Sequence, residues 1–360
     1  MTSRERLLTA LDRGTPDRLP ATLHDWMQYY LDHYLGGIDP LEAFRRFGLD
    51  ASIYVSPFLD MESSQWRITE EVVEERADYR RWLRKITTPE GTFVAVHESD
   101  QYTSWIADYP LKEPEQIRWI ERYMPVPRLD KRLVASWRER VGDDGIVRGV
   151  LPYQQPGCWQ EACQWYGTQQ MIMATFDDPV WVHEFLRILR DKKLAFVEQY
   201  QDSGYDLIEG GGGDASSTVI SPTIFEQFVA PYDREVHRAL HAVGMKIVYH
   251  TCGGMMPILE KIVGTEVDAI ETLTPREIGG DVDLAAAKRR VGAYVAMIGG
   301  MNQTHGFTYG TPQKVREMVL RNFAAAGPGG GYILSTCDHF FHAPVENLQA
   351  YAEAVRECVY

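Results

Sequence analysis

The sequence contains few cysteines and no long apolar segment. Its five cysteines are an odd number spread over 360 residues. They do not form a disulfide framework, which indicates a reducing compartment. No run approaches the ~20 apolar residues of a membrane-spanning helix, and the first residues carry no apolar signal core. We therefore expect a cytoplasmic protein that makes no membrane contact.

An excess of positive charge is also absent. The chain has 37 basic and 51 acidic side chains, which give a formal net charge of −14. Nonspecific binding to nucleic acid and binding to anionic membranes both depend on basic patches. The charge balance therefore argues against both partners, and the 44% hydrophobic and 24% charged residues are ordinary for a soluble enzyme.

One stretch, residues 245–254, combines a predicted buried strand with metal-ligating side chains. The apolar run Ile247-Val248-Tyr249 is too short for a helix and is typical of a parallel strand. It is followed by His250 and Cys252, which an extended backbone would point to the same side. Ligands of this kind at the end of a strand lie where α/β proteins place their chemistry.

A third soft ligand follows another apolar run. Cys337 ends the predicted strand 332–337, so its thiol can join His250 and Cys252 at the same edge of a sheet. Two thiolates and one imidazole are a tetrahedral zinc set with one position left for a substrate. The alternative is that both cysteines are small buried core residues and that the histidine is merely hydrogen-bonded.

Strand and helix patterns alternate along most of the chain. The predicted strands are 18–24, 51–56, 146–151, 205–208, 246–250, 269–273, 293–298 and 332–337. The predicted helices include 181–200, 224–243, 256–263, 284–290, 312–326 and 345–358. Eight strands alternating with helices predict a single α/β domain over residues 1–360, a (β/α)8 TIM barrel with an N-terminal helical extension.

A region with the period of a strand interrupts this pattern at about residues 62–110. Alternating apolar residues near 66–69, 82–86 and 92–96, with a turn at Pro89-Glu90-Gly91, predict a β-hairpin insertion. Such an insertion serves as a lid or an oligomer contact, or it is a solvated decoration.

Motifs spread over nearly the whole chain resemble those of the uroporphyrinogen decarboxylase superfamily, in particular its branch of zinc-dependent, corrinoid-linked methyltransferases. The matching residues are Ser3-Arg4-Glu5-Arg6, Pro16-Asp17-Arg18-Leu19-Pro20, Ile220-Ser221-Pro222 with Phe225 and Phe228, Pro231-Tyr232, His250-x-Cys252-Gly253, Gly299-Gly300-Met301-Asn302, Cys337 and Pro344-x-Glu346-Asn347. The resemblance implies a barrel fold and a zinc ion on His250, Cys252 and Cys337. It also implies methyl transfer involving a corrinoid.

Two departures from the family pattern narrow the expected function. The decarboxylases carry an arginine-rich loop after the first strand, whereas residues 23–30 here contain no arginine. A tetrapyrrole with several carboxylates would be repelled there, so decarboxylation of that substrate is not expected. The chain also lacks the Asp-x-His-x-x-Gly signature of a corrinoid-binding module, so the corrinoid (cobalamin) is expected on a separate partner protein. A homodimer is left open.

Three further polar residues are candidates for catalysis. Glu209 ends a strand and could be a fourth zinc ligand or a general acid/base, or a structural carboxylate paired with a lysine. Asp214 follows a glycine run at 210–213 and could be a catalytic acid, or it could cap the helix near Ser221. His339, with His342 nearby, could protonate a leaving phenoxide or support the metal loop.

Aromatic residues near the predicted site loops favour a methoxylated aromatic compound as the small-molecule methyl donor. They are Trp26, Tyr29, Tyr30, Trp159, Trp165, Tyr166, Phe340 and Phe341. We expect an O-demethylase that passes the methyl group to the Co(I) corrinoid of its partner. A methylcorrinoid:thiol methyltransferase is the first alternative. A metal-independent decarboxylase or lyase and a non-catalytic barrel are the others.

Overall fold

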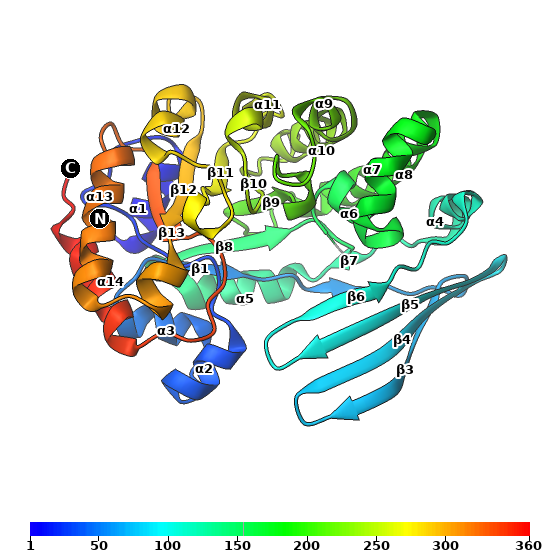
Figure 1. Cartoon of the computed structure of the whole chain (residues 1–360), viewed down its shortest axis with the longest axis horizontal. Coiled ribbons are helices and arrows are strands. Elements are labelled where there is room, and N and C mark those ends of the chain that lie inside the picture. The colour runs from blue at the N-terminus through cyan, green and yellow to red at the C-terminus, as the bar shows by residue number, and fades with distance from the viewer. Residues whose placement is uncertain (154) are drawn as a thin grey trace.

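Seven parallel strands form one curled sheet at the centre of the molecule, with helices packed around it (Figure 1). The computed structural model describes residues 1–153 and 155–360. The strand order is β1 (Ala51–Tyr54), β8 (Gly145–Val150), β9 (Leu207–Gly211), β10 (Ile247–His250), β11 (Ala269–Thr272), β12 (Ala296–Met301) and β13 (Tyr332–Thr336). This arrangement confirms the predicted α/β barrel class.

The eighth strand position is filled by a short extended segment instead of the regular strand predicted at 18–24. Ala21 forms a parallel bridge with Leu334 of β13, and its carbonyl accepts a hydrogen bond from the backbone of Asp50 next to β1. Pro20 has no N–H to donate to a strand ladder. The N–H of Ala21 donates to the Asp50 carboxylate at 2.9 Å. Residues 20–22 therefore lie between β13 and β1 without forming a ladder.

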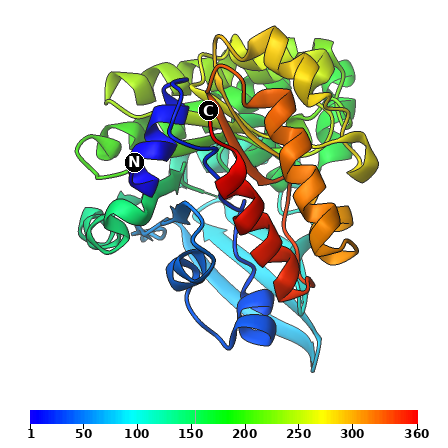
Figure 2. The same cartoon turned by 90° about the vertical axis from the view of Figure 1, so that its left-hand side faces the viewer.

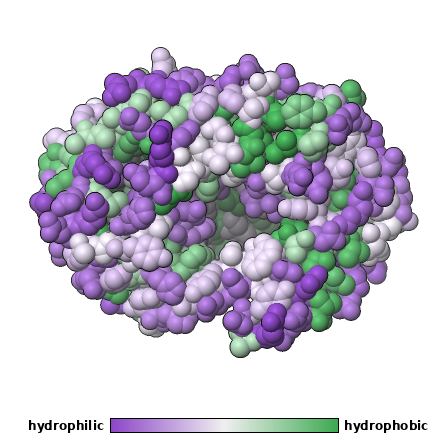
Figure 3. All heavy atoms as spheres, in the orientation of Figure 1, coloured by the Kyte–Doolittle hydropathy of each residue, from purple (hydrophilic) through white to green (hydrophobic). Residues whose placement is uncertain are grey.

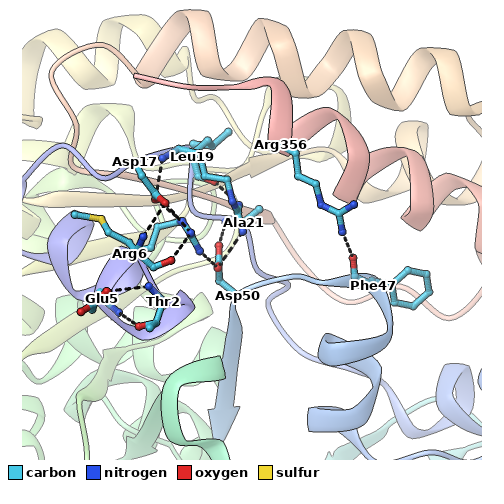
Figure 4. Close-up of polar contacts among 11 residues, drawn as sticks. Thr2, Glu5, Arg6, Asp17, Leu19, Ala21, Phe47, Asp50 and Arg356 are labelled. Atoms are coloured by element: carbon cyan, nitrogen blue, oxygen red, sulfur yellow. Dashed lines mark hydrogen bonds and ion pairs between the residues drawn. The ribbon is translucent and has the colours of Figure 1, made fainter.

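A buried charge network fixes this segment to the first helix, α1 (Ser3–Leu11). Asp50 is fully buried and accepts hydrogen bonds from Arg6 at 2.7 Å and from Arg18 at 3.3 Å (Figure 4). Arg6 also binds Asp17 at 2.7 Å. Thr2 and Glu5 form a capping box at the start of α1, as the Thr-x-x-Glu pattern indicates.

The predicted helices are present, and several additional helices surround the barrel. The remaining helices are α2 (Gln28–Leu35), α3 (Pro40–Phe47), α4 (Ile117–Tyr123), α5 (Lys131–Val141), α6 (Cys158–Tyr166), α7 (Thr168–Asp177), α8 (Pro179–Val197), α9 (Pro222–Ile224), α10 (Ala230–Ala242), α11 (Leu259–Val263), α12 (Leu284–Val291), α13 (Pro312–Ala326) and α14 (Val345–Glu357). The predicted helix 224–243 contains a π-helical turn at Phe225–Val229, where Pro231 cannot donate the regular helical bond.

The last two helices lie side by side on one flank of the barrel, close to both ends of the chain (Figure 2). Arg18 and Val359 form an antiparallel bridge, so the C-terminal residues pack against the N-terminal segment. None of the helices in the described ranges has the length and apolar character needed to cross a membrane.

The insertion is a four-stranded antiparallel sheet, larger than the predicted hairpin. Its strands are β3 (Arg67–Arg76), β4 (Tyr79–Thr88), β5 (Gly91–Asp100) and β6 (Ser104–Asp108), and β2 (Phe58–Leu59) pairs with β7 (Arg128–Leu129) beside it. At one end Phe93 packs against Trp119 and Trp165. At the other end the Tyr102 hydroxyl lies 3.0 Å from His342 Nε2, on the loop after β13. The four-stranded sheet is therefore attached to the rest of the chain at two separate places. We call this sheet, β3 to β6, the cover.

Candidate metal centre

Two neighbouring parallel strands place His250 beside a carboxylate. His250 ends β10 and is the register partner of Glu271 on β11. The ring atom Nδ1 lies 3.1 Å from Glu271 Oε1, and Nε2 lies 3.2 Å from Cys252 Sγ. A carboxylate at Nδ1 assigns the proton to that nitrogen, which directs the Nε2 lone pair toward Cys252. The predicted convergence of His250 and Cys252 is therefore present.

The turn that carries Cys252 depends on glycine. Gly253 has a φ of 93°, a left-handed conformation that side chains rarely adopt. A Cβ atom there would also lie 2.9 Å from Thr218 Oγ1. The chain therefore reverses directly after Cys252, and the thiol stays at the end of β10.

A buried network of ion pairs fixes the carboxylate that contacts His250. Arg148 of β8 is 2% exposed and donates to both oxygens of Glu271, at 2.9 and 2.8 Å. The same guanidinium lies 3.3 Å from Glu209 Oε2, which also accepts a 2.5 Å hydrogen bond from the Tyr54 hydroxyl. Two carboxylates thus share one arginine, so the partner of Glu209 is Arg148 and not a lysine.

These contacts set the charge of the site. Burial alone would raise the pKa of Glu271, but Arg148 and His250 outweigh it and hold that pKa well below its ordinary value. Burial would lower the pKa of His250, and the neighbouring Cys252, Glu209 and Glu271 raise it instead. The pKa shifts of Glu271 and His250 are those of an ion pair, and the buried carboxylates favour positive charge at the position of His250.

A second histidine joins this centre from the segment after residues 20–22. His24 stacks on His250 with ring centroids 5.0 Å apart. Burial and the charge of His250 lower the pKa of His24 to about 3, so its imidazole is neutral and can act as a ligand. His24, His250 and Glu271 are the one group of three such side chains, in the part of the chain described, whose ligand atoms lie within 4.8 Å of one another.

Cys337 lies at the same end of the barrel but outside that group. Its Sγ is 3.7 Å from the carbonyl oxygen of Leu273, and its backbone N–H donates to Gln303. Burial raises the pKa of the Cys337 thiol, with smaller contributions from Asp338 and Cys252. A metal ligand must be a thiolate, so a bound cation would have to lower this pKa.

The three predicted catalytic residues, Glu209, Asp214 and His339, do not all lie beside His250. His339 lies at the mouth, with its ring 5.0 Å from that of His24 and its Nδ1 3.3 Å from Asp338. The Asp214 carboxylate accepts a hydrogen bond from Gln160 at 2.8 Å. Asp214 does not cap the helix that begins near Ser221, because Ser221 itself accepts the bond from Ile224. Glu209 and His339 therefore adjoin the histidine centre, and Asp214 faces α6.

Most of the aromatic residues expected near the site belong to the core. Trp26, Tyr30 and Phe340 pack on one another with ring centroids 5.0–6.1 Å apart and are at most 4% exposed. Trp159 is also fully buried. Tyr29 and Phe341 instead contact Tyr102 of the cover. The interpretation of this group as a substrate pocket is wrong for the buried members, because their burial comes from packing between helices.

Sequence reasoning missed the residues that orient His250. Arg148, Glu271 and Tyr54 lie on three separate strands, and His24 follows the irregular first segment. The available signal was a charged residue inside an apolar strand, as in Ile146-Val147-Arg148 and Ala269-Ile270-Glu271. A charge in such a position is rarely buried unless it is paired.

The face of the molecule seen in Figure 3 is hollowed near its centre.

The arrangement of strands agrees with comparisons to known proteins. A family model described as uroporphyrinogen decarboxylase matches residues 155–358, more than half of the chain. The chain belongs to the uroporphyrinogen decarboxylase family. Among solved structures, a methyltransferase from Methanosarcina mazei superposes on it with a TM-score of 0.69 at 17% identity, over 99% of both chains. This likeness shows that the two chains share the same barrel fold.

Curated relatives in the family carry two different names. A methylated-thiol–coenzyme M methyltransferase from Methanosarcina mazei is 23% identical over 68% of this chain and 62% of its own length. A uroporphyrinogen decarboxylase from Psychromonas ingrahamii is 28% identical over 51% of this chain and 50% of its own length. The matched stretches thus span less than two thirds of these relatives.

Proposed function

We propose that this protein is a zinc-dependent methyltransferase that demethylates a methoxylated aromatic compound and passes the methyl group to the Co(I) corrinoid of a separate protein. The orientation of His250 carries the proposal. Its Nδ1 is held by Glu271, and its Nε2 faces Cys252 Sγ at 3.2 Å. A histidine fixed by a carboxylate on its far nitrogen is the usual arrangement of a metal-ligating imidazole.

The donor set fits zinc better than the hard cations. In the proposal His250, Cys252 and Cys337 hold the ion, and nitrogen and sulfur donors of this kind are the ligands that zinc prefers. Neutral His24, whose ligand atom lies within 4.8 Å of those of His250 and Glu271, would be available as a further ligand. Zinc in such a site supplies a Lewis acid that polarises the oxygen of an ether or lowers the pKa of a thiol.

The remaining residues orient the reactants and move a proton. The reaction would break the bond between the methyl carbon and the aryl oxygen, and the corrinoid of the partner protein would supply the electron pair that takes up the methyl group. The phenoxide that leaves takes a proton, for which His339 at the mouth is the donor in this proposal. Arg148 keeps Glu271 ionised, so that His250 stays neutral at Nε2 when it binds a cation.

The charge balance supports a neutral aryl ether over an anionic thiol. Arg148 is the cation beside His250 in the described ranges, and it already binds two carboxylates. An anionic group on a substrate would have to compete with these two carboxylates for Arg148. The rings of His24 and Tyr54, with centroids 6.4 Å apart, offer an aromatic surface instead.

A thiol methyltransferase is the second candidate. The observation in its favour is the relative named as a methylated-thiol–coenzyme M methyltransferase, which aligns with 68% of this chain. In that case the same site would hold a thiol as the methyl acceptor.

The experiment that tests the proposal follows the Co(I) absorbance of a free corrinoid mixed with the zinc-loaded protein. Methoxyphenols, which are uncharged aryl methyl ethers, should consume Co(I) and form methyl-Co(III), and the His250→Ala variant should not. A matched reaction starts from methyl-Co(III) with small thiols. Turnover of thiols alone would replace the first candidate by the second. Turnover in neither direction, with free corrinoid or with corrinoid proteins, would contradict the methyltransferase proposal.

A further inference from the structure

A cavity of about 190 Å³ lies between the four-stranded cover and the barrel, and its lining includes residues of β3, β4 and α6. Its walls come from both parts of the molecule. Ile68 and Ile86, which are register partners on β3 and β4, line one side, and Trp165 of α6 lines the other. A cavity of about 150 Å³ lined by apolar side chains is large enough to bind benzene.

The walls combine aliphatic side chains with three aromatic ones. Trp66 and Trp165 are both nearly fully buried, with ring centroids 6.0 Å apart. Tyr153 completes the lining near its opening. Aromatic rings favour edge-to-face and offset contacts with another aromatic ring over contacts with an aliphatic group.

Two charged groups lie at different parts of this cavity. Glu161 is fully buried and accepts hydrogen bonds from Trp165 Nε1 at 3.0 Å and from the backbone of Gln155 at 2.8 Å. Arg84 lies at the opening, and its ion pair with Glu70 is long, at 3.5 Å, with both side chains about half exposed. The arginine is therefore accessible to an anion that enters the cavity.

The backbone at the opening is strained. Tyr153 has a φ of 83°, a conformation that bulky residues rarely adopt. Its hydroxyl donates to the carbonyl of Pro125 at 3.2 Å, which holds the ring at the cavity. Strained residues of this kind are concentrated at ligand sites.

We propose that this cavity is a binding site for a small aromatic acid, a single benzene ring that carries a carboxylate. The ring packs in the cavity beside Trp66 and Trp165, and the carboxylate binds Arg84. Because the walls come from the cover and the barrel, a bound ring holds the two parts together.

This site is separate from the metal centre. His24, His250, Cys252, Glu271 and Cys337 are absent from its lining. Trp165 lies seven residues along α6 from Cys158, which at 1.5 Å per residue is about 10 Å from the end of the helix that adjoins Gly211. The inference therefore does not depend on the proposed methyl transfer.

Isothermal titration of the full-length protein with benzoate tests the proposal. We expect one molecule bound per chain. Ile68→Trp should abolish binding because the larger side chain fills the cavity. Arg84→Gln should weaken binding about tenfold because it removes the charge-assisted hydrogen bond. Cyclohexanecarboxylate, which has the charge without the aromatic ring, should bind more weakly than benzoate.

Two matched variants distinguish binding in this cavity from binding elsewhere on the molecule. Arg81→Gln removes an arginine of the same strand that has a similar ion pair, with Glu98 at 3.6 Å, but lies on the opposite face. Both Arg81→Gln and His250→Ala should bind benzoate as the parent does. Loss of binding in His250→Ala would overturn the proposal, since it would assign benzoate to the metal centre. Absence of binding by the parent at millimolar benzoate, or unchanged binding by Arg84→Gln, would also overturn it.

Discussion

Glu271 determines how the imidazole of His250 is presented. Its carboxylate holds Nδ1 and is itself fixed by Arg148. In the Glu271→Gln variant we expect zinc affinity to fall about 10–100-fold, as is usual when the outer partner of a metal-ligating histidine is changed. Competition with a chromophoric chelator measures this affinity. Glu226→Gln, which changes an exposed acid paired with Lys261, is the control. Equal affinity in Glu271→Gln and the parent would show that this carboxylate does not support the metal site.

Asp233 should make stability depend on pH. Burial raises its pKa from the ordinary 3.8 to about 6, although Cys158 and Tyr249 donate hydrogen bonds to it. The folded state therefore holds this proton more tightly than the unfolded state. The resulting stabilisation is complete below about pH 4 and is lost as the pH rises through 6.

In the Asp233→Asn variant this loss should disappear. The free energy of unfolding of the variant, relative to the parent, should increase by about 2 kcal/mol between pH 4 and pH 7. Urea unfolding of both proteins across this range measures the difference. A difference that does not change with pH would show that Asp233 is ionised in the folded protein at all of these values.

Contacts between residues that lie close together in the sequence could be predicted. His250 and Cys252 are two residues apart on one strand, so their convergence follows from the strand period. The contacts of Arg148 with Glu209 and Glu271 join three strands that are far apart in the chain. They depend on strand register, which no local pattern in the sequence specifies.

Asp50 is the contact through which the first segment closes the barrel. It binds Arg6 and the N–H of Ala21 in a fully buried position (Figure 4). Asp50→Asn should lower the free energy of unfolding by about 3 kcal/mol or more, because it leaves buried charge on the arginine side of the pair. Asp12→Asn, which removes an exposed partner of Lys246, should cost less than about 1 kcal/mol. Equal effects in the two variants would contradict the role given to Asp50.

The attachment of the cover through Tyr102 gives a prediction about local opening. Tyr102→Phe removes the hydroxyl that lies 3.0 Å from His342 Nε2. Amides at residues 100–104 should then exchange hydrogen faster, while global stability stays nearly unchanged. Tyr309→Phe, at a highly exposed tyrosine, is the control. Exchange at parental rates in Tyr102→Phe would show that the hydroxyl does not hold this end of the cover.

Element boundaries were predictable where caps and periodicity agree. The helix predicted at 312–326 has those bounds, since Pro312 starts it and Thr311 caps it. The fourth strand of the insertion, Ser104–Asp108, was missed; it is only five residues long and mostly exposed. The first strand was predicted too long, because the binding of Ala21 to an aspartate cannot be read from strand propensity.

For the whole molecule, alternation of strands and helices was enough to predict the barrel, and family motifs agreed with it. The cover was not predictable as a bridging element. Its attachment joins Phe93 to Trp165 at one end and Tyr102 to His342 at the other, and these contacts link residues far apart in sequence. Long-range packing of this kind leaves no periodic signal.

The central claim is that this barrel holds a catalytic zinc ion on His250, Cys252 and Cys337. Elemental analysis of protein purified without oxygen or chelator tests it most directly, together with the alanine variants of these three residues. Cys163→Ala, at another buried cysteine, is the matched control. We predict about one zinc ion per chain in the parent and in Cys163→Ala, and loss of zinc in each of the three site variants. A parent protein that holds no zinc even after reconstitution would contradict the claim and favour a metal-independent decarboxylase or lyase of the same family.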